Sequence, residues 1–120
     1  MSIFFQIDGA DVWNPSNSVA RLFIAQALTT GRELGFEPGI GPVVDDECNI
    51  DGQLFATFIS SVITRHRETN NLPLKLLIEG IIPMGVIMLE RAKIFPIESN
   101  HTGEDFWRER SVTVSKAMPQ

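Results

Sequence analysis

The segment from residue 72 to residue 92 constrains the fold most, because it is apolar along most of its length yet contains a proline. Its spacing predicts a helix. Pro83 should kink that helix, because proline lacks an amide hydrogen and clashes with the carbonyl four residues earlier, at Glu79. The apolar part, Leu76 to Leu89, is interrupted by Glu79 and is too short to cross a membrane. We therefore expect a kinked core helix and no membrane partner.

Three further helices are predicted from hydrophobic periodicity. One covers about 15–34, where apolar residues recur at steps of three and four. The next covers about 52–68, follows Asp51 as a candidate N-cap, and is the most regular amphipathic helix of the chain. The last covers about 103–117. Within it, residues 111–115 alternate in a way that is also compatible with a strand, so both alternatives stay open.

Two short regions lack helical periodicity. Residues 2–13 contain β-formers around Asp8-Gly9, a dipeptide typical of tight turns, and predict a β-hairpin. Residues 36–50 are rich in proline, glycine and acids and predict a loop. The predicted fold is mainly α, of the α+β type: a short N-terminal hairpin, then a bundle of three to four helices whose third member is kinked at Pro83. We expect residues 1–120 to form a single helical domain.

Charge and cysteine content narrow the classes of function. Fifteen acids against ten bases give a net charge of −5 at pH 7, which disfavours binding to nucleic acid. The single cysteine, Cys48, excludes an intramolecular disulfide and a thiolate zinc cluster, and the two histidines show no metal-ligand spacing. We therefore expect no metal and no other cofactor. The N-terminus lacks the pattern of a signal peptide, so a cytoplasmic location is predicted.

Glu79 is the first candidate for a ligand site, because it is a carboxylate inside an apolar segment. If buried, it would need a cation or hydrogen bonds, or its pKa would rise. Glu90 lies eleven residues further, about 16 Å along a helix, which is too far for the two carboxylates to share a proton. Pro83 would bend the helix beside Glu79, and Trp13 or Trp107 would supply an apolar wall for a small apolar ligand. The alternative is that Glu79 faces solvent on a core helix.

An acidic tract is the second candidate. Residues 33–51 contain six acids and no lysine or arginine. Three of these acids are consecutive, Asp45, Asp46 and Glu47, and would form a negative patch suited to a basic protein partner. The alternative is a solvated loop in which acids such as Asp51 cap a helix.

These sequence features include no set of residues typical of a catalytic site. The leading hypothesis is therefore a non-catalytic binding or interaction protein, an inhibitor or immunity-type partner that presents residues 45–51 to a basic target. The alternative is a small-molecule-binding protein or small enzyme whose pocket is lined by the kinked helix. A homodimer through leftover apolar surface on the helices at 52–68 and 72–92 is compatible with both.

Four short motifs carry a resemblance to a known family. They are Val12–Asn17 (Val-Trp-Asn-Pro-Ser-Asn), Gly39–Pro42, Asp46–Cys48 and Leu89–Ala92. Their order and spacing resemble a family of small, uncharacterised proteins from Streptomyces and related actinobacteria, classed as a domain of unknown function. The resemblance covers about residues 1–95. It implies a bacterial cytosolic setting and brings no known activity or catalytic residue.

Overall fold

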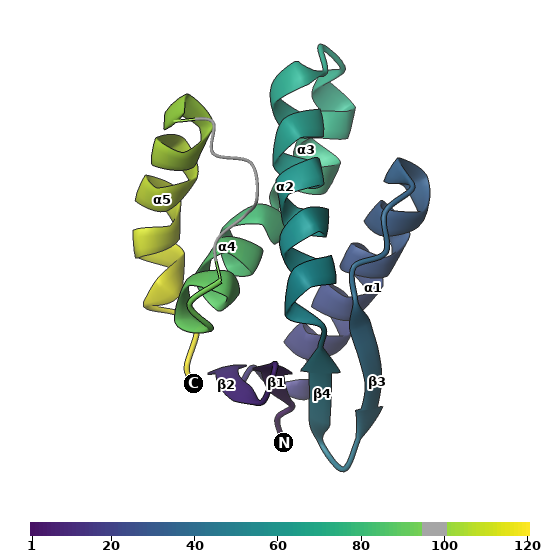
Figure 1. Ribbon diagram of the computed structural model, residues 1–120, viewed down its shortest axis with the longest axis vertical. Coiled ribbons are helices and arrows are strands. Elements are labelled where there is room, and N and C mark those ends of the chain that lie inside the picture. The colour runs from purple at the N-terminus through teal and green to yellow at the C-terminus, as the bar shows by residue number, and fades with distance from the viewer. Residues whose placement is uncertain (95–100) are drawn as a thin grey trace.

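The structure is a computed structural model that describes residues 1–94 and 101–120. Within these residues the chain forms a four-stranded sheet and a group of helices, which makes the fold α+β (Figure 1). The molecule measures 41 × 26 × 23 Å, and the sheet occupies the end where both termini lie. Helices predominate, as predicted, but the sheet is larger than the expected hairpin.

The sheet is built from two hairpins. Strands β1 (Phe4–Ile7) and β2 (Ala10–Trp13) form the first, as predicted, and β3 (Ile40–Val44) and β4 (Glu47–Ile50) form the second. The strand order is β2-β1-β4-β3, and the central pair, β1 and β4, is parallel. The predicted loop at 36–50 is therefore wrong, because most of that region is sheet.

Turn chemistry explains the second hairpin. Asp45 and Asp46 have φ angles of 52° and 63°, the left-handed conformation that a tight two-residue turn requires. Asp8 and Gly9 adopt the same conformation in the first hairpin, with φ angles of 50° and 89°. Pro42 is compatible with β3 because that strand lies at the edge of the sheet, where a missing amide donor is tolerated.

Two helices begin and end at local signals. Helix α1 (Asn17–Leu34) starts at the N-cap Ser16 and ends at Gly35, which has a φ of 79°. Helix α2 (Gly52–Glu68) starts at the N-cap Asp51, whose carboxylate accepts a hydrogen bond from a first-turn amide. The two helices occupy almost the same residues as the helices predicted at 15–34 and 52–68.

The apolar segment forms two helices, α3 (Leu72–Glu79) and α4 (Ile81–Arg91), which are separated at Gly80. A single helix kinked at Pro83 is therefore not confirmed, because the interruption lies three residues earlier. The physical reason is that Pro83 cannot bond to the Glu79 carbonyl and crowds it, whereas proline is tolerated in the first turn of a helix. Pro83 occupies that first turn in α4.

By length and composition alone, the described stretch Leu72–Arg91 could cross a membrane, since it spans 20 residues and its mean hydropathy reaches 1.9. The shorter stretch Leu76–Leu89, taken alone, predicts no membrane span because of its length. In the fold, 44% of the most apolar part is buried inside the protein. A core helix passes the same test of composition, so this evidence for a membrane span is weak.

Helix α5 (His101–Ser115) includes residues 111–115, so the helical alternative is the right one there. After α5 the chain returns to β2. The Asn14 amide donates to the Pro119 carbonyl at 2.7 Å, and the Gln120 side chain donates to the Asp11 carbonyl at 3.3 Å. These last residues therefore cover one edge of the sheet.

The core runs from one face of the sheet into the helices. A row of aromatic rings links the layers, with successive centroids 5.5 to 6.5 Å apart. The row is formed by Phe5, Trp13, Phe23, Phe55 and Phe58, each at most 3% exposed. Stacked and edge-on pairs at these distances add to the free energy of area burial. The row packs the helices against one face of the sheet, the inner face, on which Phe5 lies. The opposite face of the sheet is not covered by these helices.

Candidate functional site

The uncovered side of the sheet is the first feature with the character of a binding surface. We call it the outer sheet face and define it by Phe4, Gln6, Asp11, Val44 and Glu47. Side chains alternate along a strand, so Phe4 and Gln6 point away from the buried Phe5 and Ile7. Phe4 is 39% exposed and Val44 is 59% exposed. The outer sheet face therefore offers both apolar and acidic side chains to solvent.

Gln6 holds two carboxylates of this face in place. Its side-chain amide donates to Asp11 Oδ1 at 2.9 Å and to Glu47 Oε2 at 2.8 Å. These bonds connect β2, β1 and β4 across the sheet. The negative charges of Asp11 and Glu47 are thus fixed side by side, and neither forms an ion pair with a basic side chain that the structure describes.

Charge is unevenly distributed along the molecule. Residues 1–16 and 35–51, which include all four strands, contain seven acids and no lysine or arginine. The rest of the chain carries eight acids against all ten basic residues, so its net charge is +2. Within the described residues, none of the seven acids forms an ion pair. They are Asp8, Asp11, Glu37, Asp45, Asp46, Glu47 and Asp51.

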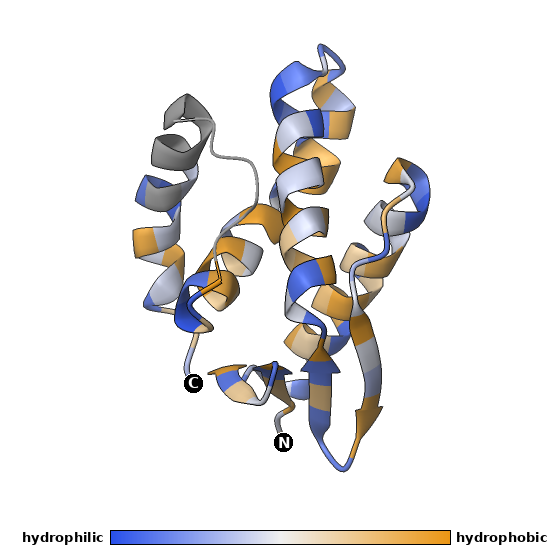
Figure 2. Ribbon diagram, viewed as in Figure 1, coloured by the Kyte–Doolittle hydropathy of each residue, from blue (hydrophilic) through white to orange (hydrophobic). Residues whose placement is uncertain are grey.

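Some of these acids have a structural role. Asp8 and Asp51 accept hydrogen bonds from amides in the first turn of α2, and Glu37 accepts one from the Gly39 amide. The predicted alternative, acids that cap helices, therefore holds for Asp51. Asp45 and Asp46 stand at the tip of the second hairpin, which is hydrophilic in Figure 2. Their carboxylates have no such bond within the described residues, so they remain available to a partner.

The four residues predicted to form a ligand site do not converge. Trp13 is 3% exposed and stacks on Phe5 in the aromatic row, and Pro83 is buried in α4. Glu79 is partly exposed at the end of α3, and Trp107 is buried on α5. Ligand binding by these four side chains stays a prediction.

Two of these four residues, Glu79 and Trp107, both contact His66. Its Nε2 lies 3.2 Å from Glu79 Oε2, and its ring meets the edge of the Trp107 ring with centroids 5.2 Å apart. The Glu79 side chain is 28% exposed, so it is neither a fully buried carboxylate nor an isolated one. No local sequence pattern indicated the pair of His66 and Glu79, because the partners are 13 residues apart and lie on two different helices.

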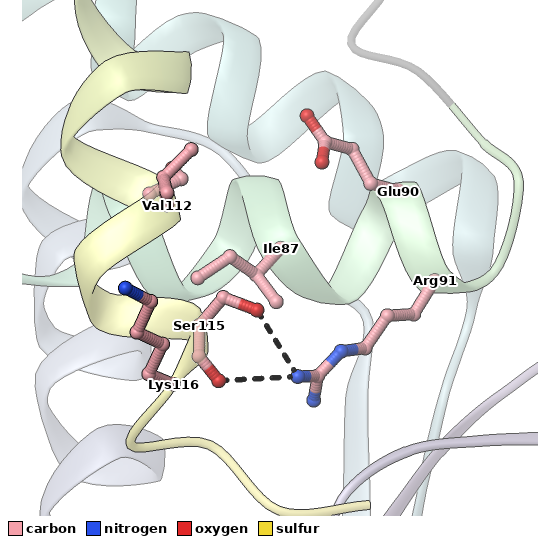
Figure 3. A pocket seen from close by; sticks show the side chains of 7 residues that line it. Ile87, Glu90, Arg91, Val112, Ser115 and Lys116 are labelled. Carbon is pink, nitrogen blue, oxygen red and sulfur yellow. Dashed lines mark hydrogen bonds between the residues drawn. The ribbon is translucent and has the colours of Figure 1, made fainter.

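A hollow of about 780 Å³ lies between α4 and α5 (Figure 3). Its lining includes the apolar side chains of Ile87 and Val112 and the charged side chains of Glu90 and Lys116. Arg91 extends across it and is already engaged, donating to the Val12 carbonyl at 2.8 Å and to the Ser115 carbonyl and hydroxyl at 3.4 Å. Burial lowers the pKa of Arg91 below its usual value, but an arginine remains charged at neutral pH. None of the four predicted ligand residues lines this hollow.

Cys48 is buried on the inner face of β4, and its thiol donates to the Gly41 carbonyl at 3.4 Å. Burial raises the pKa of Cys48 to about 11, which leaves very little thiolate at neutral pH. Within the described residues, no group of three His, Cys, Asp or Glu side chains is arranged to hold a metal ion. The geometry around Cys48 is that of a core residue.

The raised pKa of Cys48 predicts a loss of stability at high pH. The thiol deprotonates near 9.0 in the unfolded chain and near 11 in the folded protein, so the folded state holds its proton more tightly. Its contribution to stability is present below pH 9 and is lost as pH rises toward 11. Urea unfolding should therefore show a steeper loss between these pH values for wild type than for Cys48→Ala. Parallel curves for the two proteins would contradict the prediction.

Comparison with known proteins places the chain in a family. The model of a family of unknown function, DUF6086, matches residues 1–120. The chain belongs to this family. The resemblance to a domain of unknown function is thus confirmed. The match to DUF6086 covers residues 1–120, whereas the resemblance covered only about residues 1–95. No curated protein and no solved structure matched the chain.

Proposed function

We propose that this DUF6086 member is a non-catalytic binding protein, an inhibitor or immunity-type partner, that presents the outer sheet face and the Asp45-Asp46 turn to a basic surface of another protein. The observation that carries the proposal is the charge distribution: seven acids and no lysine or arginine around the sheet. A field of one sign attracts a partner of the opposite sign and orients it before contact.

The outer sheet face has the other properties that a protein partner needs. Phe4 and Val44 supply exposed apolar surface, which becomes favourable contact area when water is excluded. Gln6 fixes Asp11 and Glu47 in advance, so little side-chain freedom would be lost when a partner binds. A basic side chain that reached these carboxylates would form charge-assisted hydrogen bonds.

Neutralising the hairpin tip should weaken partner binding. Asp45→Asn with Asp46→Asn removes two charges and keeps the turn, because asparagine also tolerates positive φ. Partner recovered from a lysate of the native host on immobilised wild-type protein is identified, purified and measured by surface plasmon resonance. We expect at least a tenfold weaker association, mainly through a slower on-rate, and a shallower dependence on salt.

The matched control removes two charges elsewhere. Glu33→Gln with Glu109→Gln changes the net charge equally, and both residues are exposed on helices, outside the strand-bearing segments 1–16 and 35–51. This control should keep wild-type affinity within about twofold, because charges outside an interface act weakly through salt solution. Equal affinities of the tip variant and wild type would remove the acidic surface from the proposal.

The cellular setting belongs to the same proposal. The resemblance of the four sequence motifs supports a cytosolic protein of actinobacterial source. In that setting, this acidic protein would act on a basic protein of the same cell. Fractionation of the native host would test the location.

A second candidate function is a small-molecule-binding protein, and the hollow between α4 and α5 is the observation that favours it. Its volume is within the usual range for small-molecule sites. Since Arg91 is already hydrogen-bonded, Ile87 and Val112 would make most of the contact with a small apolar ligand. Native mass spectrometry of the protein purified from its own host tests this candidate, and a bound mass would favour it over the binding-protein proposal.

A homodimer is compatible with either function. Leucines are exposed on α1 and α3, with Leu22 at 71%, Leu72 at 61% and Leu77 at 67%. Such apolar surface is what a second copy would cover. The exposed leucines of α3 lie within the predicted 72–92 contact, and those of α1 would extend it, while the contact through 52–68 stays a prediction. Light scattering at several concentrations would decide the oligomeric state.

A further inference from the structure

A second hollow, of about 420 Å³, lies beside α2. Four residues of α2 with hydroxyl groups line it, Thr57, Ser60, Ser61 and Thr64. Their spacing of three, four and seven residues places them on one side of the helix. Phe36, from the connection between α1 and β3, also lines the hollow and is 42% exposed. The hollow therefore joins a row of hydroxyl-bearing residues to an aromatic ring.

Ser60 is the unusual member of this row. It is 5% exposed, and its hydroxyl is buried without a hydrogen-bond partner among the described residues. Two other helical serines bond to the carbonyl four residues earlier: Ser61 donates to Thr57 at 2.8 Å, and Ser111 donates to Trp107 at 2.6 Å. A buried hydroxyl with no partner destabilises the folded state. Because Ser60 belongs to the lining of the hollow, a ligand bound there is the candidate partner for this hydroxyl.

Two opposite charges complete the lining of the hollow. Arg65 and Glu68 both belong to it, and within the described residues they form no ion pair with each other or with another side chain. A ligand with a single net charge would be attracted by one and repelled by the other. A neutral ligand with several hydroxyl groups would form hydrogen bonds with both residues, because a hydroxyl accepts from the guanidinium of Arg65 and donates to the carboxylate of Glu68.

We propose that this hollow binds a neutral, polyhydroxylated small molecule with the size and chemistry of a mono- or disaccharide. Ser60 makes the buried hydrogen bond, Arg65 and Glu68 bind further hydroxyl groups, and the exposed Phe36 ring packs against the apolar C–H face of the ligand. The volume is within the usual range for small-molecule sites. This site lies apart from the outer sheet face, so the inference does not depend on the proposed function.

The test combines stability with binding in one variant, Ser60→Ala. Removing an unpartnered buried hydroxyl should raise the Tm by a few degrees, because the desolvation cost disappears. The same change should weaken ligand binding about three- to tenfold, through the loss of one hydrogen bond. The probes are glucose, maltose and trehalose, at concentrations up to tens of millimolar. Binding is followed by the shifts of the amide signals of residues 57–65 in nitrogen-15 NMR spectra.

Ser18→Ala is the matched control, because Ser18 is exposed on α1 and lies outside the hollow. It should leave both the Tm and the saccharide shifts unchanged. Glycine and inorganic phosphate serve as zwitterionic and anionic probes and should produce no shifts at 57–65. Phe36→Ala should also weaken saccharide binding.

Several results would overturn the proposal. A lower Tm for Ser60→Ala would mean that the hydroxyl already has a partner in the folded protein. No amide shift with any of the three saccharides, or shifts with phosphate or glycine in their place, would exclude a neutral polyol as the ligand class. Equal saccharide affinity in wild type and Ser60→Ala would exclude Ser60 as the buried contact.

Discussion

Gly85→Leu is expected to lower the free energy of unfolding by about 3 kcal/mol or more, because it inserts a side chain where α4 touches α2. A Cβ atom at position 85 would overlap Ile59 Cδ1 and would lie 2.8 Å from Ile59 Cγ1. Ile59 is fully buried, and Phe55 Cζ stands 3.6 Å from the same point, so neither neighbour has free space to enter. The two helices can pack at this distance only because position 85 has no side chain.

Gly80 provides the contrasting substitution. It has helical angles, φ −62° and ψ −32°, and a Cβ there would meet no atom within 4 Å. Gly80→Ala should therefore raise the free energy of unfolding by about 0.5–1 kcal/mol, since alanine restricts the unfolded chain more. Urea midpoints at constant m-value measure both changes. Gly85→Ala gives a smaller, graded loss if the leucine variant does not fold. Equal stability of Gly85→Ala and Gly80→Ala would contradict the tight contact.

Arg91→Ala should cost about 2–3 kcal/mol of stability, because the guanidinium of Arg91 connects three elements. From α4 it donates to a β2 carbonyl at Val12 and to both the carbonyl and hydroxyl of Ser115 in α5. Alanine would leave the buried Val12 without this donor. Amide hydrogen exchange should become faster in α5 and β2, in addition to the loss in global stability.

Two comparisons make the Arg91 prediction specific. Arg21→Ala, at an exposed position of α1, should change stability by less than about 0.5 kcal/mol. Arg91→Lys should recover only part of the loss, because an ammonium group cannot reproduce the planar set of donors. If the lysine variant matched wild type, charge alone would account for the role of Arg91.

Signals within a few residues of each other made the helices predictable. Helix α2 shows this best, because Asp51 caps it and its apolar residues repeat with the helical period. The interruption at Gly80 was harder to place. Pro83 identified the correct region, but the strain from a proline falls on the preceding turn, and an exposed glycine there ended α3.

The second hairpin could not be recognised in the same way. Pro42 and two glycines made residues 36–50 look irregular, and two aspartates are a less specific turn signal than Asp-Gly. The pairing that makes the region a sheet is between β1 and β4, more than 40 residues apart, so no local pattern records it. Tertiary contacts decided the conformation there.

For the candidate sites too, features formed by neighbouring residues could be predicted, whereas contacts between residues far apart in the sequence could not. The acidic tract was visible because three of its six acids are consecutive, and Asp45 and Asp46 are indeed exposed at a hairpin tip. Trp13 was predicted as a possible apolar wall of a ligand pocket, but its ring packs against Phe5 and Phe23 in the core. The buried hydroxyl of Ser60 was not predicted, since a missing hydrogen bond has no counterpart in sequence.

The covered edge of β2 has a consequence for the order of synthesis. Strand β2 is made early, yet the groups that close its edge, Arg91, Pro119 and Gln120, are made late. A nascent chain therefore holds a strand with unpaired backbone groups until residues 91 to 120 have been added, and such edges are sites of wrong pairing. On the ribosome, this sheet edge should remain open to chaperones until residues 119 and 120 have emerged.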